Sequence, residues 1–97
     1  MNNLVLTDHA RQRCAQRNID ENDILLAIRY GKRLVNAGCY IYFLGRRQIA
    51  LAGLSHDYAR LDGLTVHADE RDDGTLCVIT VYRDKEGLKK NRRKTKI

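Results

Sequence analysis

The spacing of the apolar residues changes at Gly31, and this change constrains the fold more than any other feature of the sequence. Before Gly31 the apolar residues recur at helical spacing, as in Ile24, Leu25 and Ile28. After Gly31 apolar and polar residues alternate, and β-branched and aromatic residues are frequent. The sequence therefore predicts helices in its first third and strands in the remainder, which is an α+β arrangement.

The first helix is expected to begin at a cap formed by Thr7 or Asp8 and to end at about Arg17. Asn18 follows it, and asparagine tolerates the left-handed conformation that often ends a helix. Most residues of this segment are polar, and the positions expected to face inward are Ala10 and Cys14.

The second helix is expected to begin after Asp20, with Asp23 in the place of the capping-box glutamate. Gly31 ends it as the glycine that follows the last helical turn. Beyond it, strands are expected at residues 32–36, 38–44, 48–54, 64–69 and 75–83. Residues 46–47 form a turn, residues 55–62 the longest loop, and an Asp-Gly pair a tight hairpin before the last strand.

These elements predict two N-terminal helices packed on one face of a small antiparallel sheet of four to five strands. The last strand, LCVITVYR, is the most apolar and is expected to be central. Strict alternation along it predicts that one set of side chains lies under the helices: Cys77, Ile79, Val81 and Arg83.

The composition indicates one globular domain. The chain has 97 residues, of which 43% are hydrophobic and 31% charged. No apolar run is long enough to span a bilayer, so we expect a cytoplasmic protein with no membrane partner. The cysteines are three in number and form no CxxC pair. They are expected to be small buried hydrophobic residues, and neither a metal nor a cofactor is expected.

The positive charge of the chain is concentrated at its C-terminal end. Residues 83–97 hold eight basic and two acidic side chains, which equals the net charge of +6 for the whole chain. We expect one domain over residues 1–88 and a flexible basic tail over residues 89–97. Such a tail either binds nucleic acid or an acidic partner, or is a solvated segment that keeps the protein soluble.

His9, Arg13 and Arg17 are spaced four residues apart and share one stripe of the first helix. This stripe is either a solvated face next to a carboxylate or a surface built to meet an anion. Cleavage of RNA without a metal requires groups that carry protons and cations that hold the phosphate. Histidine and arginine supply these parts, and one further group is needed, with four candidates: Arg83, Tyr82, Thr80 and Lys85. His67, on a strand expected at the sheet edge, is a reserve proton donor.

Two stretches resemble a known family. HARQRCAQRNIDENDILLAIRYG is similar to the opening of the bacterial domain-of-unknown-function family numbered 4258, and DDGTLCVITVYRD is similar to its closing hairpin. That family in turn resembles the RelE/colicin D-like (barnase-EndoU-colicin D-RelE) ribonuclease toxin superfamily. The resemblance implies two helices on a small antiparallel sheet, and it implies a toxin-type activity with a cognate antitoxin as partner.

Two functions are therefore expected. The first is a metal-independent endoribonuclease of toxin type, in which the catalytic candidates are His9, Arg13, Arg83, Tyr82 and Thr80. The second is a non-catalytic module that binds nucleic acid through the arginine stripe and the tail. In both cases RNA is the expected partner, and the residues expected to bind it are Arg17, Arg46, Arg47, Lys85, Lys89, Lys90, Arg92 and Arg93.

Overall fold

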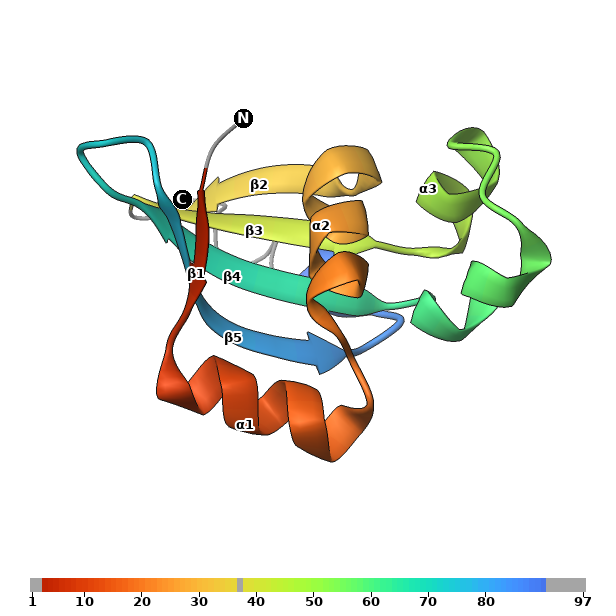
Figure 1. Cartoon of the computed structure of the whole chain (residues 1–97). Coiled ribbons are helices and arrows are strands. Elements are labelled where there is room, and N and C mark those ends of the chain that lie inside the picture. Colours follow the sequence, from red (N-terminus) through yellow and green to blue (C-terminus); the bar gives the residue numbers. More distant parts are fainter. Residues whose placement is uncertain (1–2, 37, 91–97) are drawn as a thin grey trace.

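The computed structural model describes residues 3–36 and 38–90 and contains one five-stranded sheet with helices (Figure 1). The strands are β1 (Leu4–Leu6), β2 (Lys32–Asn36), β3 (Cys39–Leu44), β4 (Leu64–Glu70) and β5 (Leu76–Arg83). The helices are α1 (Asp8–Arg17), α2 (Glu21–Tyr30), α3 (Arg46–Leu51) and the 3-10 helix η1 (His56–Leu61). The predicted α+β class, with two helices in the N-terminal part of the chain, is confirmed.

The sheet has the order β1-β5-β4-β3-β2. Consecutive strands from β2 to β5 pair antiparallel, as expected, whereas β1 pairs parallel with β5, with Leu4 opposite Leu76 and Leu6 opposite Val78. The sheet is therefore mixed. The short strand β1 was not predicted, and its presence makes β4 the central strand. β5 is an inner strand next to the centre, and the expectation that it would be central is corrected accordingly.

The caps of α1 and α2 follow the sequence closely. The Thr7 side chain accepts a hydrogen bond from the Ala10 amide at 3.1 Å, and Asn18 ends α1 in the left-handed conformation with φ of 53°. Asp20 and Asp23 form a reciprocal capping box, because each side chain accepts a hydrogen bond from the backbone amide of the other. These contacts satisfy amides that a helix N-terminus leaves without partners.

Gly31 ends α2 for a reason other than the one predicted. Its φ is −74°, so the backbone is not left-handed. A Cβ at this position would instead collide with the carbonyl oxygens of Ala27 and Phe43. The glycine is required because α2 and β3 approach each other closely here.

α1 and α2 bury their apolar sides in one cluster on one face of the sheet (Figure 1). α1 packs along β5, and α2 packs on β3 and β4. The residues that join the helices to the sheet in this cluster include Ala10, Cys14, Ile24, Ala27, Leu64, Val66, Val78 and Val81. The position of both helices on one face is thus as the sequence predicted.

The alternation predicted along β5 is interrupted by a bulge. Ala68 pairs with Val78 whereas His67 pairs with Thr80, so Ile79 is the extra residue. Val78 therefore lies in the helix-side cluster, and Val81 lies there too despite the odd spacing. The prediction was correct for Val81 and Arg83. It was wrong for Cys77, which precedes the bulge, and for Ile79, which is the bulged residue itself.

The segment predicted as a strand over residues 48–54 begins with a helix instead. α3 covers Arg46–Leu51, where Gln48 accepts a hydrogen bond from the Gly45 amide at 3.1 Å, and η1 occupies most of the predicted loop. The strand prediction relied on the alternation of Ile49 and Leu51, but glutamine, alanine and leucine favour helix. Ile49 is buried, whereas Leu51 is 76% exposed.

The described residues contain no helix that is both long and apolar enough to cross a membrane. All three cysteines are free thiols, and only Cys14 is buried, since Cys39 and Cys77 are half-buried. The expectation of three buried cysteines is therefore correct for one of them.

The helical form of residues 46–51 can be tested with a pair of substitutions. Ile49→Ala should lower the free energy of unfolding by about 2 kcal/mol or more, because it opens a cavity in the core. Leu51→Ala should change it by less than about 0.5 kcal/mol, because the side chain is solvated. Urea unfolding followed by circular dichroism measures both. Equal losses for the two variants would contradict the helix, since a strand would place both side chains on one face.

Candidate functional site

Arg83, the last residue of β5, joins the sheet to the end of α1. Its Nη1 donates a hydrogen bond to the carbonyl oxygen of Arg17 at 2.7 Å, and its Nη2 donates one to that of Asn18 at 3.4 Å. The last carbonyls of a helix lack intrahelical partners and carry partial negative charge, so a guanidinium is well suited to them. Arg83 thus lies on the side of the first helix, as the sequence predicts.

Arg83 keeps its positive charge available. Within residues 3–36 and 38–90 it forms no ion pair with a carboxylate. A guanidinium has five N–H donors, and the two carbonyls of α1 use only two of them. Arg83 is an exposed residue, so the remaining donors are accessible to a ligand.

A second arginine joins η1 to the start of α2. Arg60 donates from Nη1 to Oδ2 of Asp23 at 3.1 Å and from Nη2 to Oδ1 at 2.9 Å, which is a bidentate ion pair. Asp23 is only 1% exposed, whereas the Arg60 side chain is 46% exposed. The buried carboxylate is therefore held from outside by a guanidinium that also faces solvent.

The pKa of Asp23 is lowered from its ordinary value. Burial, the largest single influence, raises this pKa because it penalises the charged carboxylate. The hydrogen bonds from Arg60 and from the Asp20 amide, together with the charges of Arg60 and Arg83, act in the opposite direction and prevail. Asp23 is thus ionised at neutral pH. Arg60 binds Asp23 in the first turn of α2, and Arg83 binds the carbonyls at the end of α1, so both arginines contact the α1–α2 connection.

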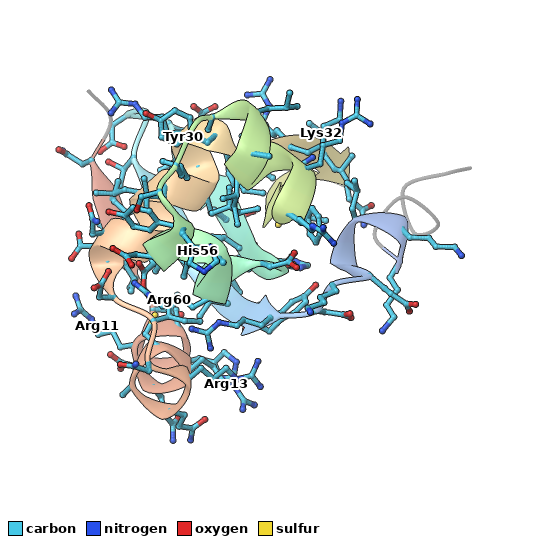
Figure 2. All side chains as sticks on the ribbon, turned by 90° about the vertical axis from the view of Figure 1, so that its right-hand side faces the viewer. Arg11, Arg13, Tyr30, Lys32, His56 and Arg60 are labelled. Atoms are coloured by element: carbon cyan, nitrogen blue, oxygen red, sulfur yellow. The ribbon has the colours of Figure 1, made fainter. Side chains whose placement is uncertain are left out.

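Both arginines line one cleft of about 390 Å³, together with Lys85, Ala59, Asp62 and Asp84. This volume lies within the range of small-molecule sites. Figure 2 shows the side of the molecule on which Arg60 lies, above the end of α1. The cleft lies at the end of β5, between η1 and the segment after Arg83, and collects cations from parts of the chain that are far apart in sequence.

The two carboxylates of the cleft have partners of their own. Asp62 accepts a hydrogen bond from the Arg46 amide at 2.9 Å and lies 3.9 Å from Lys85 Nζ. Asp84 accepts hydrogen bonds from Lys90 Nζ at 2.8 Å and from the Glu86 amide at 2.9 Å. The Lys90 hydrogen bond is the main reason that the pKa of Asp84 is lowered. The two carboxylates thus fix the backbone around the cleft through hydrogen bonds. Arg83 and Lys85 are exposed, so their cationic groups face solvent.

The structure places the predicted stripe along α1 but separates its two ends. His9 is exposed in the first turn, Arg13 is half-buried with Nη1 3.4 Å from Gln16 Oε1, and Arg17 is in the last turn. Figure 2 shows Arg11 and Arg13 on opposite sides of α1. A helix rises about 12 Å over eight residues, so His9 lies at the opposite end of α1 from the carbonyls that Arg83 binds. The structure brings the backbone carbonyl of Arg17 to the Arg83 guanidinium, and it does not bring His9 to either.

Tyr82 and Thr80 lie on the sheet face opposite the helices. They pair with Thr65 and His67 of β4, whose neighbours in the strand form the helix-side core. The Tyr82 hydroxyl and His67 Nε2 are 2.9 Å apart. Tyr82 and Arg83 therefore point to opposite faces, as successive residues of a strand do. His67 lies on the central strand, which corrects the expected position at the sheet edge.

The remaining predicted cations that the structure describes lie at the start of α3 and in the segment after β5. Arg46 and Arg47 are exposed residues that begin α3. The prediction that they form a hairpin turn is therefore wrong. Lys85 lines the cleft, Lys90 binds Asp84, and Lys89 is exposed. Lys89 and Lys90 lie in a single helical turn over residues 87–90. Arg92 and Arg93, with the rest of the predicted tail beyond residue 90, lie outside the described residues.

Sequence reasoning missed the roles of Arg60 and Asp23. Asp23 was interpreted only as a capping residue, and Arg60 as part of a polar loop. A signal was nevertheless present, because Asp23 and Ala27 are four residues apart on the buried side of α2. A carboxylate in that position requires a cationic partner.

The described residues contain no group of three histidine, cysteine or acidic side chains that could hold a metal ion. The cleft itself is lined by guanidinium and ammonium groups, which are able to bind an anion.

The Asp23–Arg60 pair predicts how stability depends on pH. The folded pKa of Asp23 lies below its ordinary value near 3.8, so its contribution is present above that value and is lost as the pH falls through the folded pKa. Asp23→Asn should therefore be less stable than the wild type at neutral pH and should lose less stability in acid.

Urea unfolding over a series of pH values measures this difference. Asp57→Asn, which removes an exposed carboxylate of η1 and keeps the pair, is the matched control and should show the wild-type loss in acid. Parallel pH profiles for the wild type and Asp23→Asn would contradict the stabilising role of the pair.

Comparison with known proteins identifies the family. The model of a family described as "Domain of unknown function (DUF4258)" matches residues 6–83. This match runs from the end of β1 to Arg83 and so includes α1, α2 and the whole of the closing hairpin. Searches of curated proteins and of solved structures give no match. The chain belongs to the DUF4258 family.

Proposed function

We propose that this protein is an RNA-binding domain that holds the phosphate backbone in the cleft lined by Arg60, Arg83 and Lys85. The observation that supports the proposal most is the convergence of three cations, from η1, from the end of β5 and from the segment after it, on one cleft. Arg60 and Lys85 face carboxylates, whereas Arg83 forms no ion pair among the described residues and so offers its positive charge to an anionic ligand.

The chemistry of the cleft suits phosphate in particular. Arginine binds two phosphate oxygens at once, and Arg83 is held in place by the carbonyls of Arg17 and Asn18 before any ligand arrives. A donor that is already ordered loses little conformational entropy on binding. Lys85, with a side chain that is 80% exposed, adds an ammonium that can adjust to the ligand.

The charge of the surrounding chain favours a polymeric ligand over a free phosphate ion. The basic run begins at Arg83 and Lys85 in the cleft and continues through the last residues of the sequence. A small anion would need only the cleft, whereas a nucleic acid offers many phosphates to such a run. RNA rather than DNA is supported by the resemblance of the family to the RelE/colicin D-like ribonuclease superfamily.

A metal-independent endoribonuclease of toxin type is the second candidate. Arg83, a cation that can stabilise charge on a phosphate, is held at the end of α1 by the backbone carbonyl of Arg17. His9, the proposed proton carrier, is separated from them by most of the length of α1, and for this reason we place binding before cleavage. A cognate antitoxin, if this candidate is correct, would cover the cleft with carboxylates.

Lys85→Ala tests the binding site without disturbing the contacts that hold α1. Single-stranded RNA binding weakens with salt by a slope of about 0.7 per phosphate contact, so this variant should flatten the slope by about that amount. Fluorescence anisotropy of labelled oligouridylate over a range of salt concentrations measures it. Arg11→Ala, which removes an equal charge on the side of α1 opposite Arg13, is the control and should keep the wild-type slope.

Equal slopes for Lys85→Ala and the wild type would show that the cleft does not contact phosphate. The cleavage candidate is tested with the same RNA in the presence of a chelator. Products that end in 2′,3′-cyclic phosphate, and that the His9→Ala variant no longer forms, would favour the endoribonuclease over the binding domain. Intact RNA under conditions in which the protein is bound supports a binding domain.

A further inference from the structure

A second cleft, of about 510 Å³, lies where the end of α2 meets α3. The residues that line it come from four segments and are Tyr30, Gly31, Lys32, Arg47, Gln48, Leu51 and Leu88. Figure 2 shows Tyr30 and Lys32 at the upper end of the molecule next to α3, well away from Arg13 on α1. No function discussed above uses this cleft.

The lining combines an aromatic ring, aliphatic groups and cations. Tyr30 is 38% exposed and Leu51 76% exposed, so each presents apolar surface to solvent. Lys32 and Arg47 are exposed at the same cleft, and the residues that line it include no carboxylate. The Arg29 guanidinium also lies over the Tyr30 ring, 6.0 Å from its centroid. An aromatic ring next to cations that no carboxylate of the lining neutralises is the combination that binds the base and the phosphate of a nucleotide together.

The two clefts are neighbours along the chain. Lys85 lines the first cleft and Leu88 lines the second, and three residues span at most about 11 Å. The two clefts are also neighbours on the side formed by α3 and η1. α3 lines the second cleft, the end of η1 lines the first, and these two helices are in contact. A single strand advances by about 3.4 Å for each stacked nucleotide, so at most about three nucleotides span the distance between Lys85 and Leu88.

We propose that the second cleft binds a nucleobase of the same RNA strand whose phosphates occupy the first. The base stacks on the ring of Tyr30 and against Leu51, while Lys32 and Arg47 contact the phosphates on either side of it. Because the stacked face is common to all bases, the cleft adds affinity for single strands with little sequence preference. This inference rests on the proposed function.

The test compares oligouridylate with an abasic strand that carries the same number of phosphates. Fluorescence anisotropy gives the affinity of each for the full chain. The wild type should bind oligouridylate about 5- to 100-fold more tightly than the abasic strand, which is the usual range for loss of one stacking contact. Tyr30→Ala should remove this difference and leave the salt slope unchanged, because the phosphate contacts remain.

Two further variants serve as controls. Tyr30→Phe should keep the preference for oligouridylate, because it retains the ring. Val35→Ala removes another exposed apolar side chain, 57% exposed on β2 and outside the cleft, and should behave as the wild type. Circular dichroism of each variant separates a loss of binding from a loss of fold.

Equal affinity of the wild type for both strands, or an unchanged affinity of Tyr30→Ala for oligouridylate, overturns the inference. If binding then still depends on Lys85 and on salt, the proposed function stands alone. If neither strand binds, the proposed function fails as well. Binding of a peptide of alternating glutamate and leucine that Tyr30→Ala abolishes, with oligouridylate unaffected, would identify the cleft as a protein-docking site and also overturn the inference.

Discussion

The hydrogen bonds from Arg83 to the carbonyls of Arg17 and Asn18 hold the architecture of the cleft together, because they fix the end of α1 against the end of β5. The backbone nearby has little freedom, since Gly63 adopts φ of +93° and a Cβ there would lie 2.9 Å from Asp84. Arg60 makes the corresponding connection for α2 through the buried Asp23. Each N-terminal helix is thus attached to the body of the domain by an arginine, and both guanidinium groups line the cleft. Fold and candidate site therefore depend on the same contacts.

The sequence predicted the helix caps and the hairpin turn correctly, because these features depend on residues that are close together in the chain. Thr7, Asn18 and the Asp20–Asp23 box act through neighbouring backbone groups, and Gly74 of the Asp-Gly hairpin has the positive φ, +86°, that such a turn requires. The failures concern features that depend on distant residues. β1 has only three residues and becomes a strand because β5, some seventy positions away, offers it a partner. The bulge at Ile79 likewise arises from pairing with β4. The strand predicted over residues 48–54 relied on a short alternation of apolar residues. In the structure the helix propensity of this segment prevails, and α3 forms.

The candidate site was predictable in part. The position of Arg83 on the side of α1 followed from the alternation of side chains along the last strand, whereas its contact with the Arg17 carbonyl was not predicted. The ion pair of Arg60 with Asp23 joins residues 37 positions apart and could not be read from spacing. The separation of His9 from Arg83 has a simple cause, because a regular helix spreads an i, i+4, i+8 stripe along its axis. Side chains in such a row form one site only if another element packs alongside the helix over the whole length of the row.

The measurement that tests the account most directly is a nuclear magnetic resonance titration of the labelled protein with oligouridylate, observed at backbone amides and arginine side chains. The account predicts that the largest changes occur at Arg60, Arg83 and Lys85, with Arg11 unchanged. It also predicts that the Arg83 resonance is already that of a hydrogen-bonded, ordered side chain before RNA is added. Changes confined to the first turn of α1 around His9, or to the sheet face that carries Thr80 and Tyr82, would contradict the placement of the phosphate site in the cleft.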